Sequence, residues 1–174
     1  MVEKAKYEII EKNNDFEIRK YPEMILATVE GYNEDNIAFN YLFNYISGNN
    51  KAQKKIEMTA PVISSEKIDM TAPVISKKDF FAFVMPSKYN KNNIPTPLDP
   101  KVKIRIEPEK KLAVIRFGGY STDKKISKYK ELLLTGLKSN NIKTKADPVL
   151  MRYNSPFAPP FFRRNEIGVE IEYD

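Results

Sequence analysis

Two short stretches of the chain carry the side chains best suited to holding a ligand. Residues 55–64, KIEMTAPVIS, recur almost unchanged at residues 67–76, KIDMTAPVIS, so Met58 and Met70 stand at equivalent positions. Near the end of the chain, residues 163–166, RRNE, place two guanidinium groups beside a carboxylate. A methionine thioether can ligate iron, and a guanidinium group can bind a carboxylate through two parallel hydrogen bonds. Both motifs therefore suggest binding rather than bond-making chemistry.

The composition excludes most familiar catalytic and metal-binding sites. The 174 residues include no histidine and no cysteine. This rules out a serine–histidine–acid triad, a thiolate nucleophile, a disulfide and any metal site built from histidine or cysteine. The carboxylates are scattered, and none lies in a motif that suggests acid–base catalysis. We therefore expect a protein that is not an enzyme.

The net charge of +6 is concentrated between residues 101 and 145, which hold thirteen Lys or Arg against four Asp or Glu. No aromatic RNA-binding motif or helix-turn-helix segment accompanies these charges, so we expect a solvated lysine surface and no nucleic-acid partner. The N-terminus is charged from its third residue, and no run of eighteen apolar residues occurs. These features predict a cytoplasmic protein with no membrane contact.

The first half begins with alternating apolar and polar residues. This pattern over residues 7–31 predicts a β-hairpin that turns near residues 13–15, followed by a further strand that ends at Gly31. Residues 33–47 then show helical spacing, with Asn33 as the N-cap and Gly48 as the stop. A buried strand is predicted for DFFAFVMP at residues 79–86.

The second half follows a polar, proline-punctuated connector. Its pattern predicts a hairpin over residues 101–120 with Pro108-Glu109 near the turn, and a helix capped by Ser121 or Thr122 that runs to about Asn140. Two final strands enclose a proline-rich loop. The apolar stripe of the helix consists of Ile126, Tyr129, Leu133 and Leu137.

The two halves resemble each other at an offset of 88 residues. Gly31-Tyr32 then falls on Gly119-Tyr120, and Tyr41 falls on Tyr129. This predicts one domain over residues 1–174, with halves of about 1–90 and 100–174 joined by a connector of about 87–100. The unit is strand–strand–helix–strand–strand used twice. The fold class is α+β, with a curved antiparallel sheet or incomplete barrel carrying two helices.

The repeat provides an internal comparison for function. The first helix carries Phe39 and Phe43 where the second carries Ser127 and Glu131. The first helix is therefore apolar beyond the single stripe that covers a sheet. The extra aromatic residues either contact a neighbouring part of the fold or form the wall of a hydrophobic pocket.

Five stretches of the chain together resemble the SOUL haem-binding protein family. They are YEIIEKNNDFEIRKYPEMILATVEG, KIEMTAPV, FFAFVMPSKY, LAVIRFGGY and RRNEIGVEI, which span nearly the whole sequence. The resemblance implies two βαββ-like repeats in a distorted barrel flanked by two helices. It also implies a non-enzymatic carrier, buffer or sensor that binds haem or another porphyrin in a hydrophobic cleft beside the first helix. The positions that match this cleft are Asn36, Phe39 and Phe43.

This chain differs from some members of the family in the residue that could ligate the iron. Some family members are proposed to ligate iron through histidine, which is absent here. An axial ligand would have to be a methionine, a tyrosinate, a lysine amine or water. Met58 is the methionine in the family-matched register. Other members rely on hydrophobic contacts, and a Lys or Arg at the rim could meet the propionates.

The predicted fold also resembles the effector-binding domains of multidrug-sensing regulators and gyrase-inhibitory proteins. Those domains bind amphiphilic, often cationic molecules near an inward acidic residue, for which Glu170 or Glu172 is the candidate here. This gives a second functional hypothesis. A protein-interaction domain without a small-molecule ligand is a third.

The remaining motifs have structural interpretations. We assign the first copy of MTAPV to a strand, and residues 68–75 to an insertion that keeps the same faces because twelve is an even number. Pro61 and Pro73 favour edge or bulged positions. Residues 163–166 are expected to fix the preceding loop through hydrogen bonds to backbone carbonyls, with an anion clamp as the alternative. The loop phenylalanines Phe157, Phe161 and Phe162 are expected to anchor that loop, with a pocket lid as the alternative.

Overall fold

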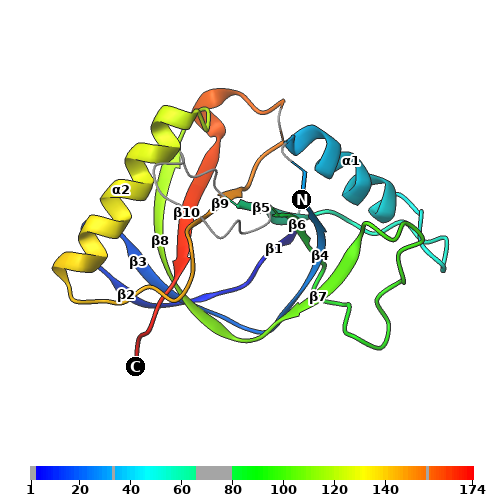
Figure 1. The fold of residues 1–174 in the computed structure, drawn as a ribbon, viewed down its shortest axis with the longest axis horizontal. Coiled ribbons are helices and arrows are strands. Elements are labelled where there is room, and N and C mark those ends of the chain that lie inside the picture. Colours follow the sequence, from blue (N-terminus) through cyan, green and yellow to red (C-terminus); the bar gives the residue numbers. More distant parts are fainter. Residues whose placement is uncertain (1–2, 33, 66–79, 156) are drawn as a thin grey trace.

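The computed structural model describes residues 3–32, 34–65, 80–155 and 157–174. These residues form a curled, mostly antiparallel sheet of ten strands and two long helices (Figure 1). The elements in chain order are β1 (Glu3–Lys4), β2 (Glu8–Lys12), β3 (Glu17–Tyr21), β4 (Met24–Glu30), α1 (Asp35–Ile46), β5 (Thr59–Ser65), β6 (Phe80–Val84), β7 (Lys103–Glu107), β8 (Lys110–Gly118), α2 (Asp123–Ser139), β9 (Val149–Arg152), the 3-10 turn η1 (Pro160–Phe162) and β10 (Arg164–Glu170).

The order of the strands displays the internal repeat. It is β2-β3-β8-β10-β9-β5-β6-β4-β7, with β1 pairing in parallel with β5. The antiparallel pair β5 and β9 lies at the centre, where Val62 faces Arg152 and Ser64 faces Leu150. Outward from this pair, β10-β8-β3 on one side corresponds to β6-β4-β7 on the other. The predicted α+β fold of two repeats with a curved sheet and two helices is confirmed.

The hairpin predicted over residues 101–120 is wrong. Strand β7 pairs with β4, and β8 pairs with β3 and β10. Two-residue hairpin turns need backbone angles that favour Asn-Gly or Gly-containing pairs, whereas proline fixes φ near −65° and keeps the preceding residue extended. At Pro108-Glu109 the chain therefore passes from β7 to β8 without forming a hairpin, as it does at Pro22-Glu23 between β3 and β4. Between the two halves, β3 thus pairs with β8, and β7 pairs with β4.

The helix ends follow the sequence signals closely. Thr122 precedes α2, and its hydroxyl accepts a hydrogen bond from the Lys125 amide at 3.3 Å, as predicted for a capping residue. The predicted cap of α1, Asn33, lies outside the described residues; the N-cap position is Glu34, whose side chain makes no capping hydrogen bond. Gly48 ends α1 in the left-handed region, with φ of +123°.

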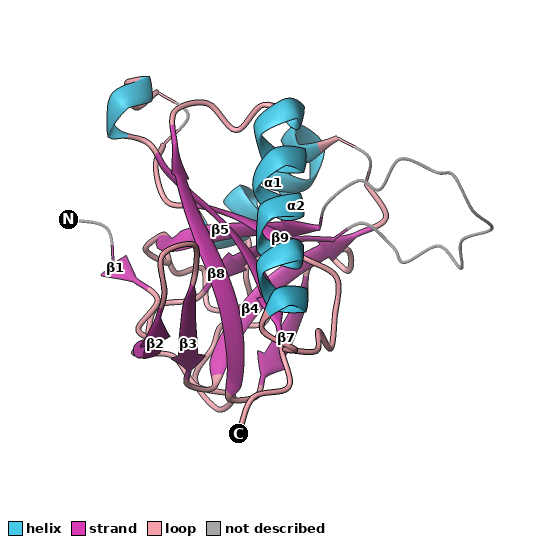
Figure 2. Ribbon diagram, turned by 90° about the vertical axis from the view of Figure 1, so that its left-hand side faces the viewer, coloured by secondary structure: helices cyan, strands magenta, loops and turns pink. Residues whose placement is uncertain are grey.

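Both helices cover the same face of the sheet. α1 packs on β4 and β6, whereas α2 packs on β8 and β10. In Figure 2, which views the molecule from the α2 side, α2 lies in front of α1. The stripe predicted for α2 is confirmed, because Ile126, Leu133 and Leu137 are buried and Tyr129 packs against the same core. Within the described ranges, no helix has the length and apolar composition needed to cross a membrane.

Candidate functional site

An aromatic ladder runs from the core to the surface along one side of α1. Phe39 lies edge-on to Phe83 of β6, with ring centroids 5.3 Å apart, and 6.5 Å from Phe81. Phe43, one turn later, stacks on Phe39 at 5.8 Å with an angle of 14° between the rings. Phe43 is nevertheless 49% exposed. The ladder therefore ends in an aromatic ring that solvent can reach.

The other predicted site residues are Met58 and Asn36. Met58 precedes β5 and is partly buried against the core cluster that also contacts Phe39. Asn36 lies in the first turn of α1 and is exposed. Phe39 and Met58 thus contact the same core cluster, Phe43 stacks on Phe39, and Asn36 is exposed on the first turn of α1.

The matching positions of α2 carry no aromatic rings. Ser127 and Glu131, which correspond to Phe39 and Phe43, are both exposed. α1 is already held to the sheet by its buried residues Ala38, Leu42, Tyr45 and Ile46. Phe43 therefore contributes an exposed apolar surface that the packing of α1 does not need.

Sequence reasoning missed a polar cluster beside the ladder, centred on Arg152 at the end of β9. Its guanidinium donates to the Asp35 carboxylate at 3.0 Å, to the Ser64 hydroxyl at 3.3 Å and to the Ser121 hydroxyl at 3.5 Å. The available signal was alternation, since Arg152 shares a strand face with Leu150, which is buried under α2. An arginine at an inward position needs polar partners, which this cluster supplies.

The RRNE motif has the structural role expected of it. Arg163 donates to the carbonyl oxygen of Ala158 at 2.8 Å, and Asn165 donates to the carbonyl oxygen of Gly119 at 2.8 Å. The Arg163 contact fixes the loop before β10, and the Asn165 contact joins the start of β10 to the residue that follows β8. Arg163 also lies 4.5 Å over the ring of Tyr120.

Glu166 of the same motif is fully buried on the sheet face opposite the helices. Arg19 of β3 binds both carboxylate oxygens, at 2.8 and 3.1 Å, and Arg164 binds one of them at 2.7 Å. Burial disfavours the charged form of Arg19, but the hydrogen bonds to Glu166 outweigh it and raise the Arg19 pKa. Arg19 also lies 4.2 Å over the ring of Tyr7. These charges bind one another and hold β3, β10 and the N-terminal segment together.

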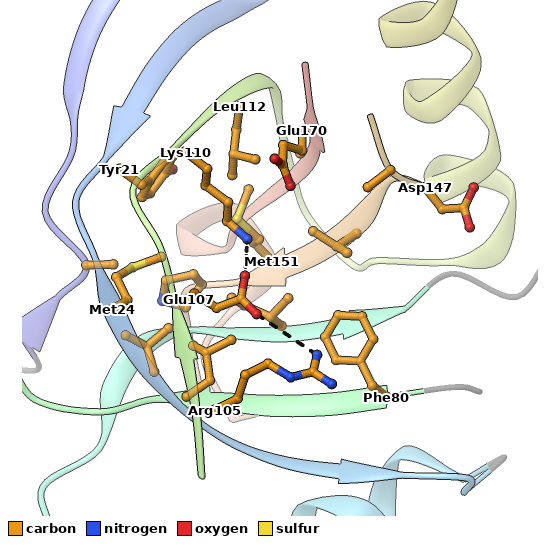
Figure 3. Close-up of a pocket in the computed structure, with 18 residues that line it drawn as sticks. Tyr21, Met24, Phe80, Arg105, Glu107, Lys110, Leu112, Asp147, Met151 and Glu170 are labelled. Atoms are coloured by element: carbon orange, nitrogen blue, oxygen red, sulfur yellow. Dashed lines mark hydrogen bonds and ion pairs between the residues drawn. The ribbon is translucent and has the colours of Figure 1, made fainter. Parts of the chain in front are cut away.

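A cavity of about 90 Å³ opens on that same face (Figure 3). Its floor is apolar, with Leu26, Val84, Leu112 and Met151 from four strands. Its charged lining residues are Arg105, Glu107, Lys110, Asp147 and Glu170.

The charges of the cavity are largely paired with one another. Lys110 lies 2.7 Å from Glu107, and Arg105 lies 4.0 Å from the same carboxylate. Glu170 forms a 3.4 Å ion pair with Lys145. Of the two acids predicted for an inward role, Glu170 lines the cavity, whereas Glu172 is exposed. A cavity of about 150 Å³ is known to hold one benzene molecule, so this smaller one is too small for a porphyrin.

The phenylalanines of the proline-rich loop are not anchors. Phe157, Phe161 and Phe162 are 94%, 80% and 69% exposed. Turn hydrogen bonds within the loop, together with Arg163, hold its shape instead. The expectation that these rings pack beneath the loop is therefore wrong.

The first MTAPV copy provides the start of β5, as predicted. The register of β5 against β6 shifts between Thr59 and Val62, which is the bulged position expected around Pro61. Strand β5 is central rather than an edge strand, since it pairs with both β6 and β9. The second copy, with Met70 and Pro73, lies outside the described residues.

The residues beside α1 suit the flat apolar faces of a porphyrin better than they suit its iron. Lys101 donates a 2.7 Å hydrogen bond to the Tyr41 hydroxyl and lowers the pKa of Tyr41, which favours a tyrosinate. Tyr41 is two residues from Phe39, however, and successive helix residues are about 100° apart, so these side chains leave α1 in nearly opposite directions. Met58 packs within the core cluster. The aromatic ladder therefore offers hydrophobic contact without an evident axial ligand.

Comparisons with known proteins agree with this architecture. A family model described as SOUL heme-binding protein matches residues 2–170. No curated protein matches the chain in sequence. The C-terminal domain of EcmrR is similar in structure, with a TM-score of 0.59 and 12% identity over 95% of this chain and 98% of that one. A protein described as a hydrolase from Listeria innocua has a TM-score of 0.60 and 13% identity, over 98% of this chain and 94% of the other. At such identities these two structures show a shared fold alone.

Proposed function

The chain belongs to the SOUL heme-binding protein family, and on that premise we propose that it is a non-enzymatic protein that binds haem or a related porphyrin beside α1. The observation that carries this proposal is the aromatic ladder Phe83–Phe39–Phe43, whose last ring is half exposed. A flat aromatic macrocycle can stack on such a ring and bury apolar surface that otherwise faces water.

Four residues of the chain have distinct roles in the proposed site. Phe43 and Phe39 provide the stacking wall, Met58 supports it from the core, and Asn36 lies at its rim. With no histidine in the sequence, we propose capture by apolar contact rather than by iron coordination. Haem, when bound, supplies an iron porphyrin whose absorption spectrum reports its environment.

The direct test replaces the exposed ring. Phe43→Ser should raise the Kd for hemin about tenfold, because an aromatic contact worth ~1.4 kcal/mol corresponds to that factor. The measurement is the Soret band during a hemin titration. Leu132→Ser is the matched control, since Leu132 is a 46% exposed residue of α2, and it should leave the Kd unchanged. Equal weakening in both variants would count against a site beside α1.

A second candidate function is favoured by the cavity on the opposite face. Glu170 lines an apolar cavity together with Glu107 and Asp147. An acidic group in apolar surroundings suits an amphiphilic cation, as in the effector-binding domains that the fold resembles. A short alkylammonium ion, which is small enough for a cavity of about 90 Å³, should then raise the melting temperature of the protein. Glu170→Gln should remove that shift, and Glu172→Gln should not, since Glu172 is exposed.

A further inference from the structure

We propose that Arg152, with the hydroxyls of Ser64 and Ser121, forms a carboxylate-binding site, and that Asp35 occupies it until a carboxylate of the ligand takes its place. The inference rests on the proposed porphyrin function and assigns the end of the site that receives a propionate. Arg152 of β9, Ser64 of β5 and Ser121 of the segment before α2 converge at the start of α1.

The cluster lies next to the aromatic ladder. Asp35 and Phe39 are four residues apart on α1, so they lie on one side of the helix, one turn from each other. On the sheet below, Arg152 is the β9 partner of Val62, which packs against the core cluster that also contacts Phe39. A ligand that stacks on Phe43 and Phe39 and extends toward the start of α1 therefore meets this guanidinium.

The hydrogen bonds of Arg152 are weaker than those that it could make to a well-placed carboxylate. Its bonds to the two serine hydroxyls are long, at 3.3 and 3.5 Å, and Asp35 accepts through one oxygen only. Arg19, by contrast, engages both oxygens of Glu166. Guanidinium groups bind carboxylates best through two parallel hydrogen bonds. Arg152 therefore holds a weaker complement of partners than its chemistry allows.

The exposed position of Asp35 allows its carboxylate to separate from Arg152. Its side chain is 56% exposed, and the ion pair with Arg152 is correspondingly open to water. Exposed ion pairs of this kind are weak. Water can solvate Asp35 once a ligand carboxylate displaces it. The incoming carboxylate would also meet the positive end of the α1 dipole, which Asp35 otherwise compensates.

The repeat supplies this guanidinium only on the α1 side. At the offset of 88 residues, the position corresponding to Arg152 is Ser64, which is uncharged, although Asp35 and Asp123 occupy matching positions in the two helices. The aromatic ladder is likewise confined to α1. Arg152 and the aromatic ladder are thus two independent departures from the repeat that lie at one place. Their proximity indicates that they serve one function.

The test uses substitutions with opposite expected effects. Arg152→Gln should weaken hemin binding about tenfold, as expected for the loss of a charge-assisted hydrogen bond. Asp35→Asn should strengthen hemin binding, because it removes the competing carboxylate. Neither change should alter the binding of hemin dimethyl ester, which lacks free carboxylates. A merely structural ion pair would not make the two substitutions act in opposite directions.

Two controls separate local from overall charge. Arg116→Gln removes a positive charge from an exposed residue of β8, and Asp123→Asn removes the matching acid of α2. Both should leave hemin affinity unchanged. If Arg152→Gln does not fold, as judged by circular dichroism, the wild-type protein still provides a test, since it should bind hemin more tightly than the dimethyl ester.

The outcomes distinguish the two proposals. Wild-type protein that binds hemin and its ester equally, with Asp35→Asn unchanged, would overturn the carboxylate site and leave porphyrin binding intact. Wild-type protein that binds neither compound would overturn the proposed function itself.

Discussion

Glu166 shows how a residue that looks suited to a ligand is instead committed to the fold. Its carboxylate is buried between Arg19 and Arg164, which come from strands on either side of β8. No sequence pattern reveals this pairing, because Arg19 lies 147 residues away from Glu166. The extra aromatic rings of α1, Phe39 and Phe43, could by contrast be recognised from sequence, since the second half of the chain offered the comparison with Ser127 and Glu131. Their role in a binding site stays a prediction.

The network around Glu166 gives a prediction about stability. Glu166→Gln should lower the free energy of unfolding by about 3 kcal/mol, because the buried guanidinium of Arg19 and the partly buried guanidinium of Arg164 lose the carboxylate they share, and Glu17 remains as a partner of Arg19 alone. Urea unfolding measures the change. Glu30→Gln, which breaks the exposed pair between Glu30 and Arg105, should cost about 1 kcal/mol or less. Similar losses in the two variants would show that burial does not govern the network.

At the scale of elements, the helices, most strands and the β2–β3 hairpin could be predicted from sequence, and the other strand pairings could not. The pattern over residues 103–118 correctly indicated two strands around Pro108, but a short link between strands does not specify which neighbours they choose. In the structure, β7 pairs with β4 of the first half and β8 pairs with β3 of the first half, so the two strands joined at Pro108 are not neighbours in the sheet. Likewise, composition alone could not tell whether Phe161 is covered, since exposed and buried phenylalanines look the same in a loop sequence.

The start of α2 provides a prediction at this scale. Thr122→Ala should lower the free energy of unfolding by about 1 kcal/mol, since the Lys125 amide loses its side-chain acceptor. Ser127→Ala, at an exposed position inside the same helix, should be neutral or slightly stabilising because alanine is the better helix former. Thermal or urea unfolding compares the two. A larger loss for Ser127→Ala would contradict the assigned cap.

At the scale of the whole molecule, the curled sheet separates two kinds of surface. One face carries both helices, the aromatic ladder and Arg152; the other carries the buried arginine network and the small cavity. The general architecture followed from the repeat in the sequence. The cavity did not, because it is assembled from strands of both halves whose order depends on the unpredicted pairings.

This separation predicts that the two candidate ligands bind independently. An alkylammonium ion held near Glu170 and a porphyrin held beside Phe43 would lie on opposite faces of the sheet. A saturating concentration of this cation should therefore leave the Kd for hemin unchanged in a spectroscopic titration. Mutual displacement would mean that both compounds share one site.

The central claim is that this chain holds a porphyrin by apolar contact beside α1 without coordinating its iron. The most direct test titrates the purified protein with hemin and, in parallel, with metal-free protoporphyrin. The account predicts saturable binding of both, with Kd values that agree within about threefold, which corresponds to less than ~1 kcal/mol. A strong preference for hemin would require an axial ligand and would contradict the account, as would the absence of saturable binding by either compound.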